Sequence, residues 1–190
     1  MMMVKSISQS PREAVLRSVV APRARLYALI DSARCPEGPK QAEDANMAYE
    51  SLLAGPLGRE LGDVAPYLVE FRARSSFGEW WFEQWGRSIG VLVEAPVSLD
   101  ELRRHFRTLL VVRHEDRRKY FFRFYDPRVL RVFLPNTTTT EVKRFFGPVS
   151  AFYCEGPEGK ELLTFKRGRD GASATQSPVS PPKPERGRAV

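Results

Sequence analysis

The sequence predicts one α+β domain, from about residue 24 to residue 165, with a mixed, mostly antiparallel sheet flanked by helices. Two observations predict this class. Short apolar runs typical of strands alternate with segments whose apolar residues recur at helical spacing. Turn residues and helix N-terminal signatures separate these segments. A lead at residues 1–23 and a disordered, basic, proline-rich tail at residues 166–190 complete the predicted organisation.

The expected elements follow the chain in order. Residues 11–17 can start a helix with Ser10 as its N-cap, and a disordered lead is the alternative. Strands are expected at residues 26–30, 66–72, 88–93, 109–112 and 119–125. The last two form a hairpin around which we expect the sheet to be built. Helices are expected at 42–53, from Ser76, after capping boxes at Ser98 and Thr138, and from Asp126 to Phe133. A final hairpin joins 149–154 to 161–165.

The aromatic run that ends the predicted hairpin carries the most information. Period-2 alternation places Tyr120, Phe122 and Phe124 on one face, which we expect to be buried. Asp126 and Pro127 then suit the N-cap and the first position of a helix. The result is a strand-to-helix corner that we take as a candidate partner-binding site.

The candidate residues at this corner are Arg123, Tyr125, Asp126 and Arg128. A structural role is the alternative, and it is compatible with binding. In that role, Asp126 caps the helix while Arg123 or Arg128 pairs with a neighbouring carboxylate.

Three tryptophans on the helix from Ser76 form a second candidate site. Trp81 and Trp85 share a helix face, and Trp80 lies about 100° away from Trp81 around the axis. Core packing explains one face. A partner-binding groove or aromatic anchor is the alternative, because tryptophan is enriched in interface hot spots.

Composition describes a soluble protein of mildly basic character. The net charge is +7, of which residues 166–190 carry +4, so residues 1–165 carry only +3. The two cysteines are isolated in sequence, which favours a reducing cytoplasmic setting, although one disulfide bridge is possible. Charged residues interrupt the start of the chain, and no apolar run reaches the length of a membrane span. A transit peptide within the first 25 residues is an alternative.

No arrangement of residues indicates catalysis. His105 and His114 lack the short spacing of metal ligands to each other or to Cys35 and Cys154. Neither a nucleophile with an adjacent base nor a phosphate-binding glycine loop is evident. We therefore expect no enzymatic activity, no cofactor and no metal.

The cationic and aromatic run from residue 117 to residue 125 also fits a nucleic-acid-binding hairpin, helped by the basic tail. RNA-recognition strands, however, carry glycines between their aromatic residues, and this run has none. Three cations at a hairpin turn are more often a solvated edge. Nucleic acid is therefore the alternative partner rather than the expected one.

Four blocks of the sequence resemble a known family. They are Leu26-Tyr-Ala-Leu-Ile-Asp31, Pro66-Tyr-Leu-Val69, Arg123-Phe-Tyr-Asp-Pro-Arg-Val-Leu130 and Phe145-Phe-Gly-Pro148. In this order they are similar to the domain of unknown function 4123, and the third block is the most specific. The resemblance implies an adaptor or chaperone of the bacterial type VI secretion system. Such a protein is cytoplasmic and non-enzymatic, and it pairs a secreted effector with the valine-glycine repeat spike protein.

Overall fold

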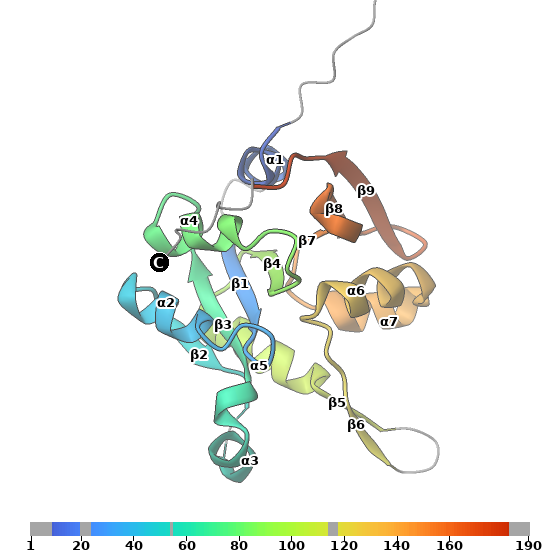
Figure 1. Ribbon diagram of the computed structural model, residues 1–190. Coiled ribbons are helices and arrows are strands. Elements are labelled where there is room, and N and C mark those ends of the chain that lie inside the picture. Colours follow the sequence, from blue (N-terminus) through green and yellow to red (C-terminus); the bar gives the residue numbers. More distant parts are fainter. Residues whose placement is uncertain (1–8, 20–23, 54, 114–117, 183–190) are drawn as a thin grey trace, which may run out of the picture.

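The computed structural model describes residues 9–19, 24–53, 55–113 and 118–182. A seven-stranded sheet with the order β2-β3-β1-β4-β7-β8-β9 forms its centre (Figure 1). All the neighbouring strands in this sheet are antiparallel. The strands are β1 (Arg25–Asp31), β2 (Tyr49–Ser51), β3 (Pro66–Phe71), β4 (Gly90–Ala95), β7 (Ala151–Glu155), β8 (Glu161–Arg167) and β9 (Ala172–Pro178). The α+β class with a mostly antiparallel sheet is confirmed.

Helices cover both faces of the sheet. They are α1 (Pro11–Ser18), α2 (Gly38–Asp44), α3 (Gly55–Glu60), α4 (Ser76–Glu83), α5 (Leu99–Leu109), α6 (Pro127–Phe133) and α7 (Thr139–Phe146). Single turns of 3-10 helix lie at Gly62–Val64, Leu134–Asn136 and Pro157–Gly159. Buried side chains of α1, α2 and α4 form one core, and those of α5, α6 and α7 form the other. β1 supplies both cores, because successive side chains of a strand point to opposite faces.

The alternation is visible in β1 itself. Tyr27 and Leu29 belong to the core under α5, α6 and α7, whereas Ala28 and Ile30 belong to the core under α1, α2 and α4. This explains why the apolar run 26–30, predicted to be a buried strand, has no polar position. The strand ends at Asp31, which is fully buried.

The helix expected at residues 42–53 is wrong. Helix α2 ends at Asp44, and Asn46 then adopts a left-handed backbone conformation with φ of 54°. The chain continues into β2, where Tyr49 pairs with Val69 of β3. Helical spacing of the apolar residues was therefore overridden by an edge-strand pairing that the local sequence cannot reveal.

The hairpin expected at residues 109–125 exists, but it is not the centre of the main sheet. Its strands β5 (Val111–Arg113) and β6 (Lys119–Phe121) form a separate two-stranded ribbon (Figure 1). The strand ends at Phe121, so Phe124 enters the core from a turn and is fully buried. Tyr120 is 47% exposed, and its predicted burial is wrong.

The fold extends beyond residues 24–165 at both ends. The expected disorder from residue 166 is wrong for residues 172–178, because they form β9 and pair with β8 along its whole length. Helix α1 packs on the sheet, and the Tyr153 hydroxyl donates a hydrogen bond to the Ser18 carbonyl oxygen at 3.1 Å. The remainder of the predicted lead and tail, residues 1–8, 20–23 and 183–190, lies outside the described residues.

The capping box predicted at Thr138 is complete, whereas for the one predicted at Ser98 the described contacts include only the first of its two hydrogen bonds. Thr138 and Glu141 form a complete capping box at α7, as expected. At α5, the Ser98 hydroxyl accepts a hydrogen bond from the Glu101 N–H at 3.3 Å. Across the described ranges, no helix has both the length and the apolar character needed to cross a membrane.

Candidate functional site

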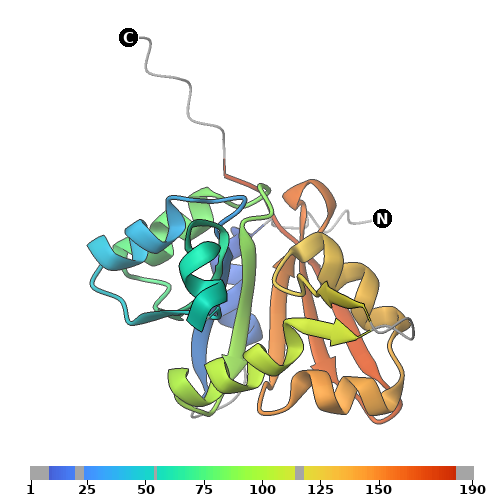
Figure 2. The same ribbon diagram turned by 90° about the horizontal axis from the view of Figure 1, so that it is seen from below.

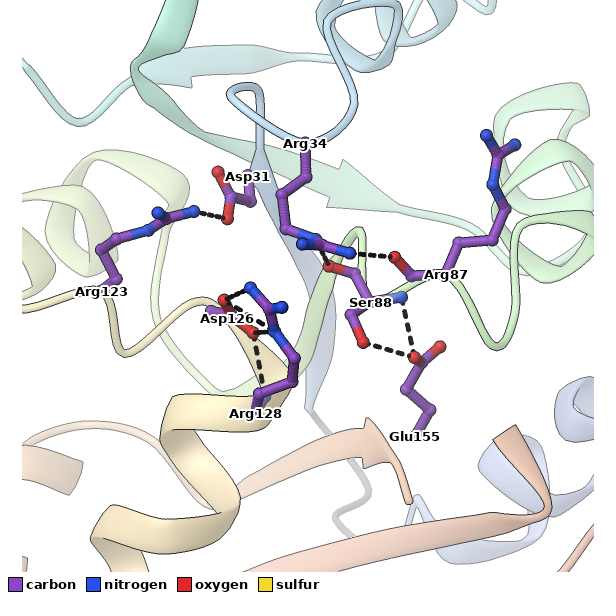
Figure 3. A network of polar contacts seen from close by, with 8 residues as sticks. All are labelled: Asp31, Arg34, Arg87, Ser88, Arg123, Asp126, Arg128 and Glu155. Carbon is purple, nitrogen blue, oxygen red and sulfur yellow. Dashed lines mark hydrogen bonds and ion pairs between the residues drawn. The ribbon is translucent and has the colours of Figure 1, made fainter. Parts of the chain in front are cut away.

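The strand-to-helix corner lies against the end of β1. The guanidinium of Arg123 donates a hydrogen bond to Oδ2 of Asp31 and forms an ion pair with it (Figure 3). This contact raises the pKa of Arg123, because the hydrogen bond and the charge of Asp31 favour the guanidinium. It joins two segments that lie 92 residues apart in the sequence.

Asp126 is both a helix cap and an ion-pair partner. Its Oδ1 accepts a hydrogen bond from the Arg128 N–H at 2.9 Å, which caps α6 as the sequence predicted. The Arg128 guanidinium reaches the same carboxylate, with Nη2 at 2.7 Å from Oδ2. Burial opposes ionisation of Asp126, but these hydrogen bonds outweigh it and lower the pKa of Asp126.

The remaining corner residue, Tyr125, is 6% exposed. Burial raises the pKa of its hydroxyl to about 12. Tyr125 is therefore a neutral core residue that packs edge-on against Phe124. Of the four corner residues, only Arg123 and Arg128 offer substantial surface, with side chains 41% and 50% exposed.

A second polar cluster lies beside this corner and was not predicted. The Glu155 carboxylate accepts hydrogen bonds from the N–H and the hydroxyl of Ser88 at 2.7 and 2.9 Å (Figure 3). Arg34 donates to the carbonyl oxygen of Ser88 at 3.1 Å. These contacts hold Ser88 in a left-handed conformation with φ of 55° at the approach to β4. Because Glu155, Ser88 and Arg34 bond to one another within the protein, we interpret them as residues that position the loop before β4.

Trp80 and Trp81 lie on α4, whereas Trp85 lies in the turn beyond its end at Glu83, so the helix predicted to carry all three tryptophans is shorter than expected. The tryptophans are largely core residues. Trp81 and Trp85 are 3% and 8% exposed, and the Trp85 indole N–H donates to the Gly159 carbonyl oxygen at 2.8 Å. Trp80 is half-buried and stacks on Phe77. The buried rings of Trp81 and Trp85 cannot contact a partner without rearrangement. Of the three tryptophans, only Trp80 therefore presents surface at this candidate site.

Exposed apolar side chains gather instead on the β5–β6 ribbon. Val111 and Val112 are 41% and 45% exposed, and Tyr120 and Phe121 are 47% and 51% exposed. The register places Val111 opposite Phe121 and Val112 opposite Tyr120. Because neighbouring residues of a strand face opposite ways, the ribbon exposes apolar groups on both of its faces. We call these four residues the hairpin patch.

An open groove of about 590 Å³ lies between the ribbon and the helices α6 and α7. Figure 2 shows the ribbon on the side of the sheet that these helices cover. The lining residues are Thr108, Leu109, Val111, Val112, Phe122, Phe133, Glu141, Arg144 and Phe145. Sequence reasoning missed this groove. The available signal was the aromatic run itself, but its alternation does not show which face a helix covers.

The two cysteines are buried, and His105 is half-buried. Burial is the main cause that raises the pKa of both Cys35 and Cys154 to about 12, so neither is a ready thiolate. The His105 ring is close to the Phe145 carbonyl oxygen, with Nε2 at 2.8 Å, and burial lowers its pKa. His114 lies outside the described residues. Among the described residues, no cluster of three His, Cys, Asp or Glu side chains could hold a metal ion.

Comparison with known proteins gives one family match. The sequence model of the family described as Domain of unknown function (DUF4123) matches residues 26–144. The matched segment includes Asp31, the corner residues and the β5–β6 ribbon. No curated protein and no solved structure matches the chain.

Proposed function

We propose that this chain, which belongs to the family Domain of unknown function (DUF4123), is a non-enzymatic adaptor or chaperone of type VI secretion. In this role it binds a secreted effector in the cytoplasm and helps load that effector onto the valine-glycine repeat spike protein. Family membership is consistent with this role, and the surface of the domain supports it.

The hairpin patch is the observation that carries the proposal. Of the seven large apolar residues exposed within the described part of the chain, four belong to this one ribbon. A two-stranded ribbon is marginally stable on its own, and clustered exposed apolar groups are typical of protein-binding surfaces. Aromatic residues such as Tyr120 and Phe121 are also enriched at the centre of such interfaces. The ribbon is therefore well suited to bury its patch against a partner.

The test is co-purification of the full chain with the protein products of the genes that flank its own. We expect an effector, a spike protein or both to elute with the chain as a defined complex. Recovery of neither protein from cells that express all of them would contradict the proposal.

A nucleic-acid-binding module is the second candidate, because the exposed rings of Tyr120 and Phe121 adjoin the cations Arg118 and Lys119 in sequence. It predicts tight binding of single-stranded nucleic acid with an affinity that falls steeply as salt increases. A fluorescence-anisotropy titration with labelled single-stranded DNA and RNA distinguishes the two candidates. Absent binding at low salt would exclude the nucleic-acid role, whereas tight, salt-sensitive binding without recovery of a protein partner would favour it.

A further inference from the structure

The groove beside the ribbon has an apolar floor. Phe122, Phe133 and Phe145 line it from three different segments, and their rings pack together, with centroids 4.6 Å apart for Phe122 and Phe133 and 5.1 Å for Phe133 and Phe145. Val111 and Val112 of the hairpin patch form one wall. The groove is open to solvent and has a volume of about 590 Å³.

One acidic and one basic residue line the groove. Glu141 lines it, but its carboxylate accepts hydrogen bonds from the N–H and the hydroxyl of Thr138 at 2.9 and 2.7 Å. Arg144 lines the same side, is exposed, and has no ion pair or hydrogen bond within the described ranges. The acidic residue is therefore occupied, whereas the basic residue is available.

We propose that this groove binds a protein segment that inserts apolar side chains between the ribbon and α7 and places a carboxylate against Arg144. The proposal rests on the adaptor function and specifies the chemistry of one of its partners. The apolar side chains supply most of the affinity, because they are removed from water against the phenylalanine floor. The carboxylate selects acidic segments, because it pairs with an otherwise unoccupied guanidinium.

The experiment selects binding peptides from a random phage-displayed library on the full chain. Selected peptides are then synthesised, and their affinities are measured by fluorescence anisotropy. We expect sequences that combine aromatic or aliphatic residues with Asp or Glu. Val112→Asp should weaken their binding by about tenfold or more. Arg144→Glu should weaken it about fivefold, and replacing the peptide's acidic residues with Lys should restore binding to that variant.

Two matched controls lie outside the groove. Val132→Asp makes the same substitution at a valine that is 67% exposed, and Lys143→Glu reverses the cation that precedes Arg144 on α7. Both control variants should bind the peptides as the unaltered chain does. Failure to select any peptide would overturn the proposal. So would Val112→Asp and Arg144→Glu variants that bind the selected peptides as tightly as the unaltered chain does. Self-association of the chain that Val112→Asp abolishes would also overturn it, because the occupant would then be a second copy.

The groove and the adaptor role can fail separately. An effector that co-purifies equally well with the Val112→Asp and Arg144→Glu variants would exclude the groove but leave the adaptor role intact. Selected peptides that behave as expected, with no effector or spike protein recovered by the full chain, would contradict the adaptor role alone.

Discussion

Arg123 forms an ion pair with Asp31, a fully buried carboxylate that lies 92 residues earlier in the chain. Asp31 ends β1, an inner strand of the sheet, and Arg123 lies in the chain between β6 of the ribbon and α6. The pair therefore connects the segment that follows the hairpin patch to the main sheet. It also connects the first and third blocks of resemblance, to which Asp31 and Arg123 belong.

The first prediction concerns this pair. Arg123→Met should lower the free energy of unfolding by about 2 kcal/mol, because it leaves the Asp31 carboxylate buried without its cation. Urea denaturation measures the change. Arg107→Met is the control, since Arg107 is exposed and has no ion pair among the described residues, and it should change stability little.

A double-mutant cycle separates the pair from other effects of the substitution. Adding Asp31→Asn to Arg123→Met removes the unpaired charge, so the double variant should be more stable than the sum of the single changes implies. Strict additivity would show that the two residues are not coupled.

The second prediction concerns pH. The pKa of Asp126 is lowered in the folded protein, so its ion pair stabilises the fold above its ordinary pKa of about 4. That stabilisation is lost as pH falls through the folded pKa. Asp126→Asn keeps a helix cap but has no charge, so its stability deficit should be largest near neutral pH and should shrink towards about pH 3. Urea denaturation curves at a series of pH values measure this deficit. A deficit that does not change with pH would contradict a stabilising ion pair at Asp126.

The third prediction concerns Gly147, which ends α7 with φ of 50°. A Cβ atom there would overlap the ring of His105. Gly147→Ala should therefore destabilise the protein by about 1–3 kcal/mol in thermal or urea unfolding. Gly62→Ala is the control, because no heavy atom lies within 4 Å of a Cβ at that position. Equal effects of the two substitutions would argue against the close approach of His105.

The fourth prediction tests the capping box of α7. Thr138→Ala removes the acceptor of the Glu141 N–H and should cost about 1 kcal/mol of stability. Thr140→Ala alters an exposed residue of the same first turn and should stay within about 0.5 kcal/mol of the unaltered chain. Urea denaturation of both variants measures the difference. A Thr138→Ala variant as stable as Thr140→Ala would show that the cap contributes nothing.

Local signals predicted much of the secondary structure. The capping box at Thr138 specifies its helix start through contacts three residues apart, and the apolar run 26–30 is recognisable from its own composition, although β1 pairs with the distant strands β3 and β4. The errors arose where a distant partner decided the outcome. Tyr49 joined a strand because Val69 pairs with it, and the polar segment 172–178 became a strand because its backbone pairs with β8. A polar edge strand carries little apolar pattern by which to recognise it.

The same contrast between local signals and distant partners applies to the candidate site. The cap formed by Asp126 was predictable, because the cap and the N–H that it binds are two residues apart. A carboxylate partner for Arg123 could be anticipated, but its identity could not, because Asp31 is brought there only by the sheet. The groove depends on where α6 and α7 pack relative to the ribbon. Alternation of apolar residues in one strand does not contain that information.

The most direct measurement is the affinity of the full chain for a purified effector and for the spike protein, titrated with the unaltered chain, Phe121→Asp and Val132→Asp. Phe121 belongs to the hairpin patch, whereas Val132 is an exposed apolar residue on α6 outside it. We predict that Phe121→Asp weakens binding of at least one partner by about tenfold or more, and that Val132→Asp leaves both affinities unchanged. The account would be contradicted if the unaltered chain bound neither partner, or if the Phe121→Asp variant bound both partners as tightly as the unaltered chain does.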